Sequence, residues 1–214
     1  SITELNNITA QTTGVVTATL AANSIANLAS LATEATDQIT ITINDADATS
    51  ITAADLSTLG DKTAGTVTVT NAVNIIGDHD QVTAALVTES TKVSVSDATV
   101  IINDANATSI TAAELAAIGA ATTGTVTVTN AVAITGTTAQ LTAALVTEST
   151  KVAVSDATVI INDAAFDANN NNTTLNASDL SAIGNATTGT VTITNAVKIA
   201  GSQSDLTAAL VTES

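Results

Sequence analysis

Three Asn-Asp pairs are the candidate metal ligands of this sequence. Each pair follows an alternating apolar run, and they are Asn44-Asp45, Asn103-Asp104 and Asn162-Asp163. Calcium takes roughly six to eight oxygen ligands of this kind, so the pairs suggest calcium corners. The predicted ligands are Asp45, Asp104, Asp163 and Asp167. The alternative is a set of Asx turns, in which Asn and Asp bond their own backbone at a corner of the chain.

Catalytic constellations are not indicated. His79 is the only histidine, and it stands in a polar turn whose related copies carry no histidine. The sequence shows no nucleophile motif, phosphate-binding glycine loop or zinc-ligand spacing. Its carboxylates recur as features of a repeat rather than as one facing pair. We therefore expect a protein that is not an enzyme and that has no cofactor apart from calcium at the corners.

Asn-X-Ser/Thr triplets are candidates for covalent modification. The predicted glycosylation acceptors are Asn106, Asn172, Asn176 and Asn185. The alternative is that these triplets follow from an Asn- and Thr-rich composition alone. The single aromatic residue, Phe166, lies in the long segment 163–175. There it predicts either a contact between subunits or a fold-back onto its own turn of the chain.

The elements that would position these residues are written as a repeat. The nonapeptide GTVTVTNAV begins at Gly65 and Gly124, and it returns with one Val→Ile change at Gly189. Its strict alternation of Thr and Val has the period of a half-buried β-strand. A strand that recurs at long intervals indicates stacked repeats. The repeats are 65–123, 124–188 and a half-repeat 189–214, with degenerate coils in 1–64 and an insertion loop at 163–175.

Each full repeat consists of two related half-repeats. Both run as a strand, a polar corner, a second short strand and a Thr-Ala-Ala segment. Thr52, with Asp55 three residues on, has the layout of a helix N-cap, and Gly60 suits a C-terminal cap. The expected fold is mainly β: a single β-solenoid, or β-helix, of about seven coils over 1–214, with a short helical turn or helix in each coil.

Composition limits the partners. The 214 residues carry a net charge of −16 with Lys and Arg together numbering 4, so neither nucleic acid nor an anionic membrane surface is an expected partner. Membrane insertion is not expected either, because no apolar run approaches membrane-spanning length. With Phe166 as the only aromatic, small and β-branched side chains must fill the core. Layers of constant cross-section can be filled in this way.

Segments such as TTGVVTATL, ITAADLSTLGDKT, GTVTVTNAVNI and QLTAALVTES resemble the giant Thr/Ala-rich tandem-repeat surface and matrix proteins of cyanobacteria and other aquatic bacteria. The resemblance covers nearly the whole chain and implies a β-solenoid rod outside the cell. We therefore expect a non-catalytic structural protein that forms an extracellular rod or filament, as a surface layer, sheath, fibre or matrix. A calcium-stabilised adhesin or spacer module is the alternative, and an ice-binding solenoid is a minor one. Cell-surface polysaccharide is a further candidate partner.

Neither end of the sequence carries a capping element. A repeat stack without caps exposes unpaired backbone groups on its first and last strands. We expect these ends to pair, either by continuation of the repeat array or by head-to-tail stacking of copies, which does not close on itself. Val191 and Ile193, beside the last strand, and Phe166 are the predicted interface residues.

Overall fold

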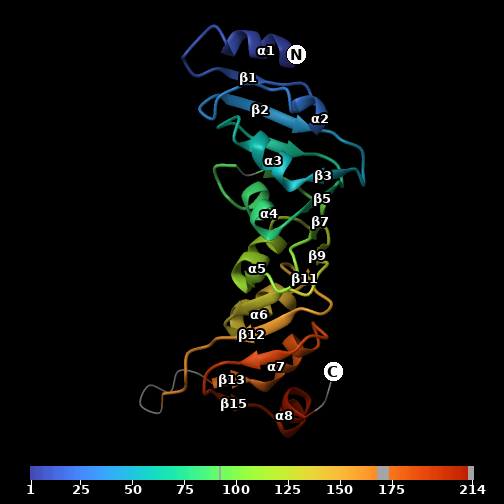
Figure 1. Cartoon of the computed structure of the whole chain (residues 1–214), viewed down its shortest axis with the longest axis vertical. Coiled ribbons are helices and arrows are strands. Elements are labelled where there is room, and N and C mark those ends of the chain that lie inside the picture. The colour runs from blue at the N-terminus through green and yellow to red at the C-terminus, as the bar shows by residue number, and fades with distance from the viewer. Residues whose placement is uncertain (92, 168–173, 212–214) are drawn as a thin grey trace. The chain divides into compact units, whose positions relative to one another are not determined.

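The computed structural model describes residues 1–91, 93–167 and 174–211 (Figure 1). The chain divides into two compact units: unit 1 contains Ser1–Ile102 and Ala121–Thr125, and unit 2 contains Asn103–Ala120 and Val126–Ser214. The described residues form eight helices and fifteen strands, with more residues in helices than in strands. Strand pairings within each unit are parallel. The fold is therefore α/β with parallel sheets, and the expected mainly β solenoid is wrong.

Unit 1 alternates helices with short parallel strands. Its elements are α1 (Ile2–Thr9), β1 (Thr17–Thr19), α2 (Ile25–Leu28), β2 (Gln38–Ile43), β3 (Ser50–Thr52), α3 (Ala53–Gly60), β4 (Val67–Val69), β5 (Asn74–Gly77), α4 (His79–Leu86), β6 (Val93–Ser94) and β7 (Thr99–Ile102). The strands form the rows β1-β2-β4-β6 and β3-β5-β7. In the first row Ile41 lies opposite Val67, and Val67 lies opposite Val93. All three side chains are buried, so the core is a ladder of aliphatic side chains.

Unit 2 repeats the pattern. Its elements are β8 (Ser109–Thr111), α5 (Ala112–Ala120), β9 (Val126–Val128), β10 (Ala133–Gly136), α6 (Thr138–Leu145), β11 (Val152–Ala153), β12 (Thr158–Ile161), β13 (Thr174–Asn176), α7 (Ala177–Gly184), β14 (Val191–Ile193), β15 (Lys198–Ala200) and α8 (Gln203–Leu210). Within the unit the rows are β8-β10-β12-β14, β9-β11 and β13-β15. One ladder runs through Ile110, Ile134, Val159 and Val191. The first three are fully buried, whereas Val191, on the end strand, is 36% exposed.

The Thr-Ala-Ala segments form complete helices, and this makes the fold α/β. Thr52 caps α3 by accepting a hydrogen bond from the Asp55 N–H at 3.1 Å, which confirms the predicted N-cap. Within unit 1, α3 packs on α4, and within unit 2, α5 packs on α6 and α7 on α8 (Figure 1). Within each unit these helices pack on one another in a layer of their own. A mainly β coil has no such layer.

Gly60 does not cap α3. It lies inside the helix, the following Asp61 is the C-cap in a right-handed conformation, and no glycine of the described residues has a positive φ. A Cβ built on Gly60 would lie only 2.1 Å from the carbonyl oxygen of Thr91. In unit 2 a Cβ on Gly119 would meet the Thr150 carbonyl oxygen at the same distance. Glycine is therefore required here for the close approach of the next half-repeat, and the predicted C-terminal cap at Gly60 is wrong.

Candidate functional site

Two of the three Asn-Asp corners place their carboxylates at the N-termini of helices. In unit 1, an Oδ atom of Asp45 accepts a hydrogen bond from the N–H of Ile25, the first residue of α2, at 2.7 Å. In unit 2, Asp163 accepts from both the N–H and the hydroxyl of Thr138, the first residue of α6, each at 2.7 Å. A carboxylate here satisfies a free helix N–H group and interacts favourably with the helix dipole. These partners account for Asp45 and Asp163 without a cation.

The four predicted calcium ligands are divided between the two units. Asp45 belongs to unit 1, whereas Asp104, Asp163 and Asp167 belong to unit 2. Asp104 is 5% exposed, while Asp167 is exposed. Across residues 1–91, 93–167 and 174–211, no three Asp, Glu, His or Cys side chains gather as a metal-binding group. Calcium binding at these residues stays a prediction.

The corners are tied to the next half-repeat by a recurring asparagine. The Nδ2 atoms of Asn71, Asn130 and Asn195 donate hydrogen bonds to the carbonyl oxygens of Asp45, Asp104 and Asp163 at 2.6, 2.6 and 2.8 Å. Each bond lies within one unit. The residue type and the acceptor position are the same every time, so the polar corner is a structural joint between half-repeats rather than a set of local Asx turns.

Phe166 occupies the third copy of a backbone joint. The N–H of Ala48 donates to the Ala72 carbonyl at 2.8 Å, and the N–H of Ala107 donates to the Ala131 carbonyl at 2.7 Å. The N–H of Phe166 makes the equivalent bond to the Ala196 carbonyl at 2.7 Å. Its backbone is therefore anchored, while its side chain is 38% exposed. Val191 is exposed to a similar extent and Ile193 is half-buried, and the interface role of all three stays a prediction.

The predicted glycosylation acceptors are exposed where the structure describes them. Asn106 lies after β7 and uses its Oδ1 to accept from the Ala131 N–H at 3.2 Å. Asn176 is the N-cap residue of α7 and donates to Asp179, and Asn185 is the C-cap residue of the same helix. Asn172 lies outside the described residues. Modification of these residues stays a prediction.

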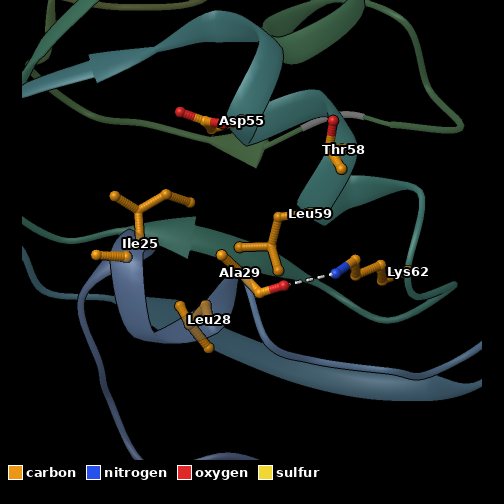
Figure 2. A pocket seen from close by; sticks show the side chains of 8 residues that line it. Ile25, Leu28, Ala29, Asp55, Thr58, Leu59 and Lys62 are labelled. Atoms are coloured by element: carbon orange, nitrogen blue, oxygen red, sulfur yellow. Dashed lines mark hydrogen bonds between the residues drawn. The ribbon is translucent and has the colours of Figure 1, made fainter.

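A cavity lies between α2 and α3 in unit 1, and no sequence pattern indicated it (Figure 2). Its volume is about 230 Å³, and Ile25, Leu28 and Leu59 supply apolar walls. Lys62 lies at its edge, where its Nζ donates to the carbonyl oxygens of Ala29 at 3.0 Å and Leu31 at 2.6 Å. A cation at the end of α2 stabilises the carbonyls that the short helix leaves unpaired. The cavity forms where a helix of only four residues packs on one of eight.

Buried threonines form a second feature that our sequence analysis missed. The Thr63 hydroxyl, in unit 1, donates to the carbonyl oxygens of Asp37 and Ile39, both at 2.9 Å, and accepts from the Ile39 N–H at 2.8 Å. Thr122 donates to the Ala98 carbonyl in the same unit, and Thr187 donates to the Ala157 carbonyl in unit 2. The signal was present, because each threonine stands two residues before a GTV strand start.

Comparisons with family models, with curated proteins and with solved structures found no match. Among the described residues, no helix combines the length and apolar character that crossing a membrane requires.

Proposed function

We propose that this chain is a non-catalytic structural protein that builds an extracellular rod or filament at the cell surface. It serves as a surface layer, sheath, fibre or matrix component, and its partner is a further array of the same repeats. The resemblance of its repeats to those of large bacterial surface and matrix proteins supports this proposal. Buried threonine side chains that hydrogen-bond the backbone of an earlier half-repeat also support it.

The observation that carries the proposal is the buried threonine bracket. Thr63, Thr122 and Thr187 are at most 7% exposed, and each bonds the backbone of an earlier half-repeat. In each bracket the hydroxyl also accepts the N–H of the glycine two residues on, at 2.8 to 3.0 Å. A buried hydroxyl with all its partners satisfied rigidifies its surroundings. Within its unit, each bracket therefore ties a half-repeat that begins with GTV rigidly to the half-repeat before it.

Charge supports the same function. The chain carries a net charge of −16, and its few basic residues include Lys62, which is bound to backbone carbonyls. Like-charged surfaces repel copies that approach side by side. Growth along the repeat direction is then favoured over bundling. Cell-surface polysaccharide is an additional proposed partner, whereas calcium-dependent adhesion and ice binding rest on the sequence pattern alone.

Negative-stain microscopy of material from the native source tests the proposal. The expected images show filaments or long rods with an axial repeat. Dispersed compact particles without rods or filaments would contradict it. A matched variant, Thr122→Val, keeps the side-chain volume but removes the bracket hydroxyl. It should give shorter or irregular rods when the protein is expressed in its own host.

A further inference from the structure

The cavity between α2 and α3 in unit 1 has apolar walls and one side open to solvent. Leu28 and Leu59 line it and are 0% and 3% exposed, so its floor belongs to the packed core. Ile25 is half-buried, and the exposed Ala29 lies at the open side. An apolar cavity of about 150 Å³ is large enough to hold benzene. At about 230 Å³, this cavity has room for one ring with a small substituent.

The lining of the cavity carries one acid and one base. Asp55 lies in the first turn of α3, and Lys62 follows the end of the same helix. Seven residues of helix span about 10 Å, and Figure 2 shows the two side chains well apart, with Leu59 between them. The lining therefore has no net charge, while the net charge of −16 on the whole chain repels anions. An uncharged ligand suits such a site best.

Lys62 is fixed at one side of the cavity and keeps a donor for a ligand. Its Nζ donates to the carbonyl oxygens of Ala29 at 3.0 Å and Leu31 at 2.6 Å. A lysine ammonium has three N–H donors, and the part of the chain that the structure describes supplies no third acceptor. The remaining N–H can donate to an oxygen atom of a ligand that occupies the cavity.

The repeat changes its sequence at this cavity. The residue before each bracket threonine is lysine in this copy and alanine in the other two: Lys62, Ala121 and Ala186. One helical turn earlier, a threonine of this copy again corresponds to alanines: Thr58, Ala117 and Ala182. Both polar residues line the cavity. Lys62 also binds the end of α2, but the Thr58 hydroxyl donates to Ala54 within its own helix, so the short α2 does not explain Thr58.

We propose that the cavity between α2 and α3 binds a small uncharged molecule, one ring that bears a carbonyl or hydroxyl oxygen. The ring contacts Leu28 and Leu59, and the oxygen accepts a hydrogen bond from Lys62 Nζ. The site goes beyond the structural function proposed above and does not depend on it, because all of its lining residues belong to unit 1.

NMR titration of the full chain with acetophenone, which is a ring with a carbonyl group, tests the site. The amide signals of Ile25, Leu28 and Leu59 should shift in a saturable way, with a Kd of about 1 mM or lower. Toluene has the same ring without an acceptor and should bind about tenfold more weakly, because it lacks the hydrogen bond to Lys62. Benzoate should also bind more weakly than acetophenone. The absence of saturable shifts with acetophenone, or tighter binding of benzoate, would overturn the proposal.

Three variants locate the binding. Ala29→Leu fills the cavity and should abolish the acetophenone shifts, whereas the matched control Ala35→Leu enlarges an exposed alanine of unit 1 outside the cavity and should change nothing. Lys62→Met keeps the apolar stem but removes the donor. It should weaken acetophenone binding about tenfold and leave toluene binding unchanged. Unaltered binding by Ala29→Leu would refute the site. Equal loss of both probes in Lys62→Met would refute the hydrogen bond that the proposal assigns to Lys62.

Discussion

Gly119 and Gly184 occupy the same position near the ends of α5 and α7 in unit 2, but their surroundings differ. Gly119 is pressed against the Thr150 carbonyl, which leaves no room for a Cβ, whereas Gly184 has open space around it. The repeat sequence is nearly the same at both places. The comparison shows that one residue can be a packing requirement in one half-repeat and dispensable in another, depending on whether a further half-repeat lies on it.

Replacing both glycines by alanine tests this comparison with the largest expected effect. Gly119→Ala must displace backbone on one side of the contact, which should lower the free energy of unfolding by about 3 kcal/mol. Gly184→Ala should raise it by about 0.5 kcal/mol or more, because alanine is the better helix former. Urea unfolding of the two variants measures both values. Equal destabilisation by the two substitutions would show that contact with the Thr150 carbonyl is not the reason for glycine at position 119.

Two leucines at equivalent positions of α6 and α8 allow the same comparison of a covered and an uncovered side chain. Leu141 in α6 is fully buried, whereas Leu206 in α8 is only half-buried. Leu141→Ala should cost about 2.5 kcal/mol of unfolding free energy, because the substitution leaves a cavity that the neighbours fill only partly. Leu206→Ala should cost about 1 kcal/mol, in proportion to the smaller area that it buries. Equal losses in the free energy of unfolding, measured by chemical denaturation, would mean that α8 is as well covered as α6.

Removing the Asp163 carboxylate at the start of α6 should have a smaller effect on the free energy of unfolding. Asp163→Asn weakens the acceptor for the N–H and hydroxyl of Thr138 and removes the charge at the helix N-terminus, which should cost about 1 kcal/mol. Asp156→Asn is the matched control, since Asp156 is exposed and accepts from the neighbouring Ser155. Thermal unfolding of wild type and Asp163→Asn with and without excess calcium completes the test. A calcium-dependent rise in Tm that only wild type shows would assign calcium to this corner.

The smallest expected effect on stability concerns Asp205 in the first turn of α8, and this effect depends on pH. A hydrogen bond from the Ser202 hydroxyl, and then one from the Ser202 N–H, hold the pKa of Asp205 below its usual value. A carboxyl whose pKa is lower in the folded than in the unfolded state contributes stability above the unfolded pKa, about 3.9, and loses it as pH falls through the folded pKa. The α6 counterpart is Gln140, which does not titrate in this range.

Asp205→Asn should therefore make unfolding less sensitive to pH below about 4, by a small amount because solvent screens a partly exposed carboxylate. The measurement is the pH dependence of the urea midpoint, with Gln140→Glu as the reciprocal variant that should add such a dependence at α6. An unchanged pH profile for Asp205→Asn would contradict this account of its pKa.

The strands and the N-cap at Thr52 were predictable from the sequence, but the share of the fold that is helical was not. The alternation in GTVTVTNAV located β4, β9 and β14 directly, since a period of two is a strong signal. The Ala-rich segments carry a weak helical pattern, so they predicted a short helical turn or helix in each coil, whereas α3 and α5 have eight and nine residues. Their tertiary packing on one another decides their length, and a single sequence does not display that packing. The mainly β expectation failed for this reason.

The sequence predicted where the candidate site lies, but it did not predict which groups its carboxylates bind. The sequence located the polar corners at Asp45 and Asp163, yet both the calcium and the Asx-turn interpretations looked for partners nearby in the chain or in solvent. The actual donors are Ile25 and Thr138, which precede the acids by 20 and 25 residues. Partners at that separation are set by the stacking register. The cavity beside Lys62 forms because α2 is short, and no sequence motif predicts the length of this helix.

Appending a second copy of residues 150–188 after Ser214 tests most directly the claim that each half-repeat is completed by the next. The account predicts that the extended chain is more stable in urea than the parent chain. It also predicts that Gly184→Ala changes sign, from neutral or stabilising in the parent to destabilising by about 3 kcal/mol in the extension, because the appended Thr carbonyl now lies on Gly184. An extended chain in which Gly184→Ala remains harmless would contradict the account.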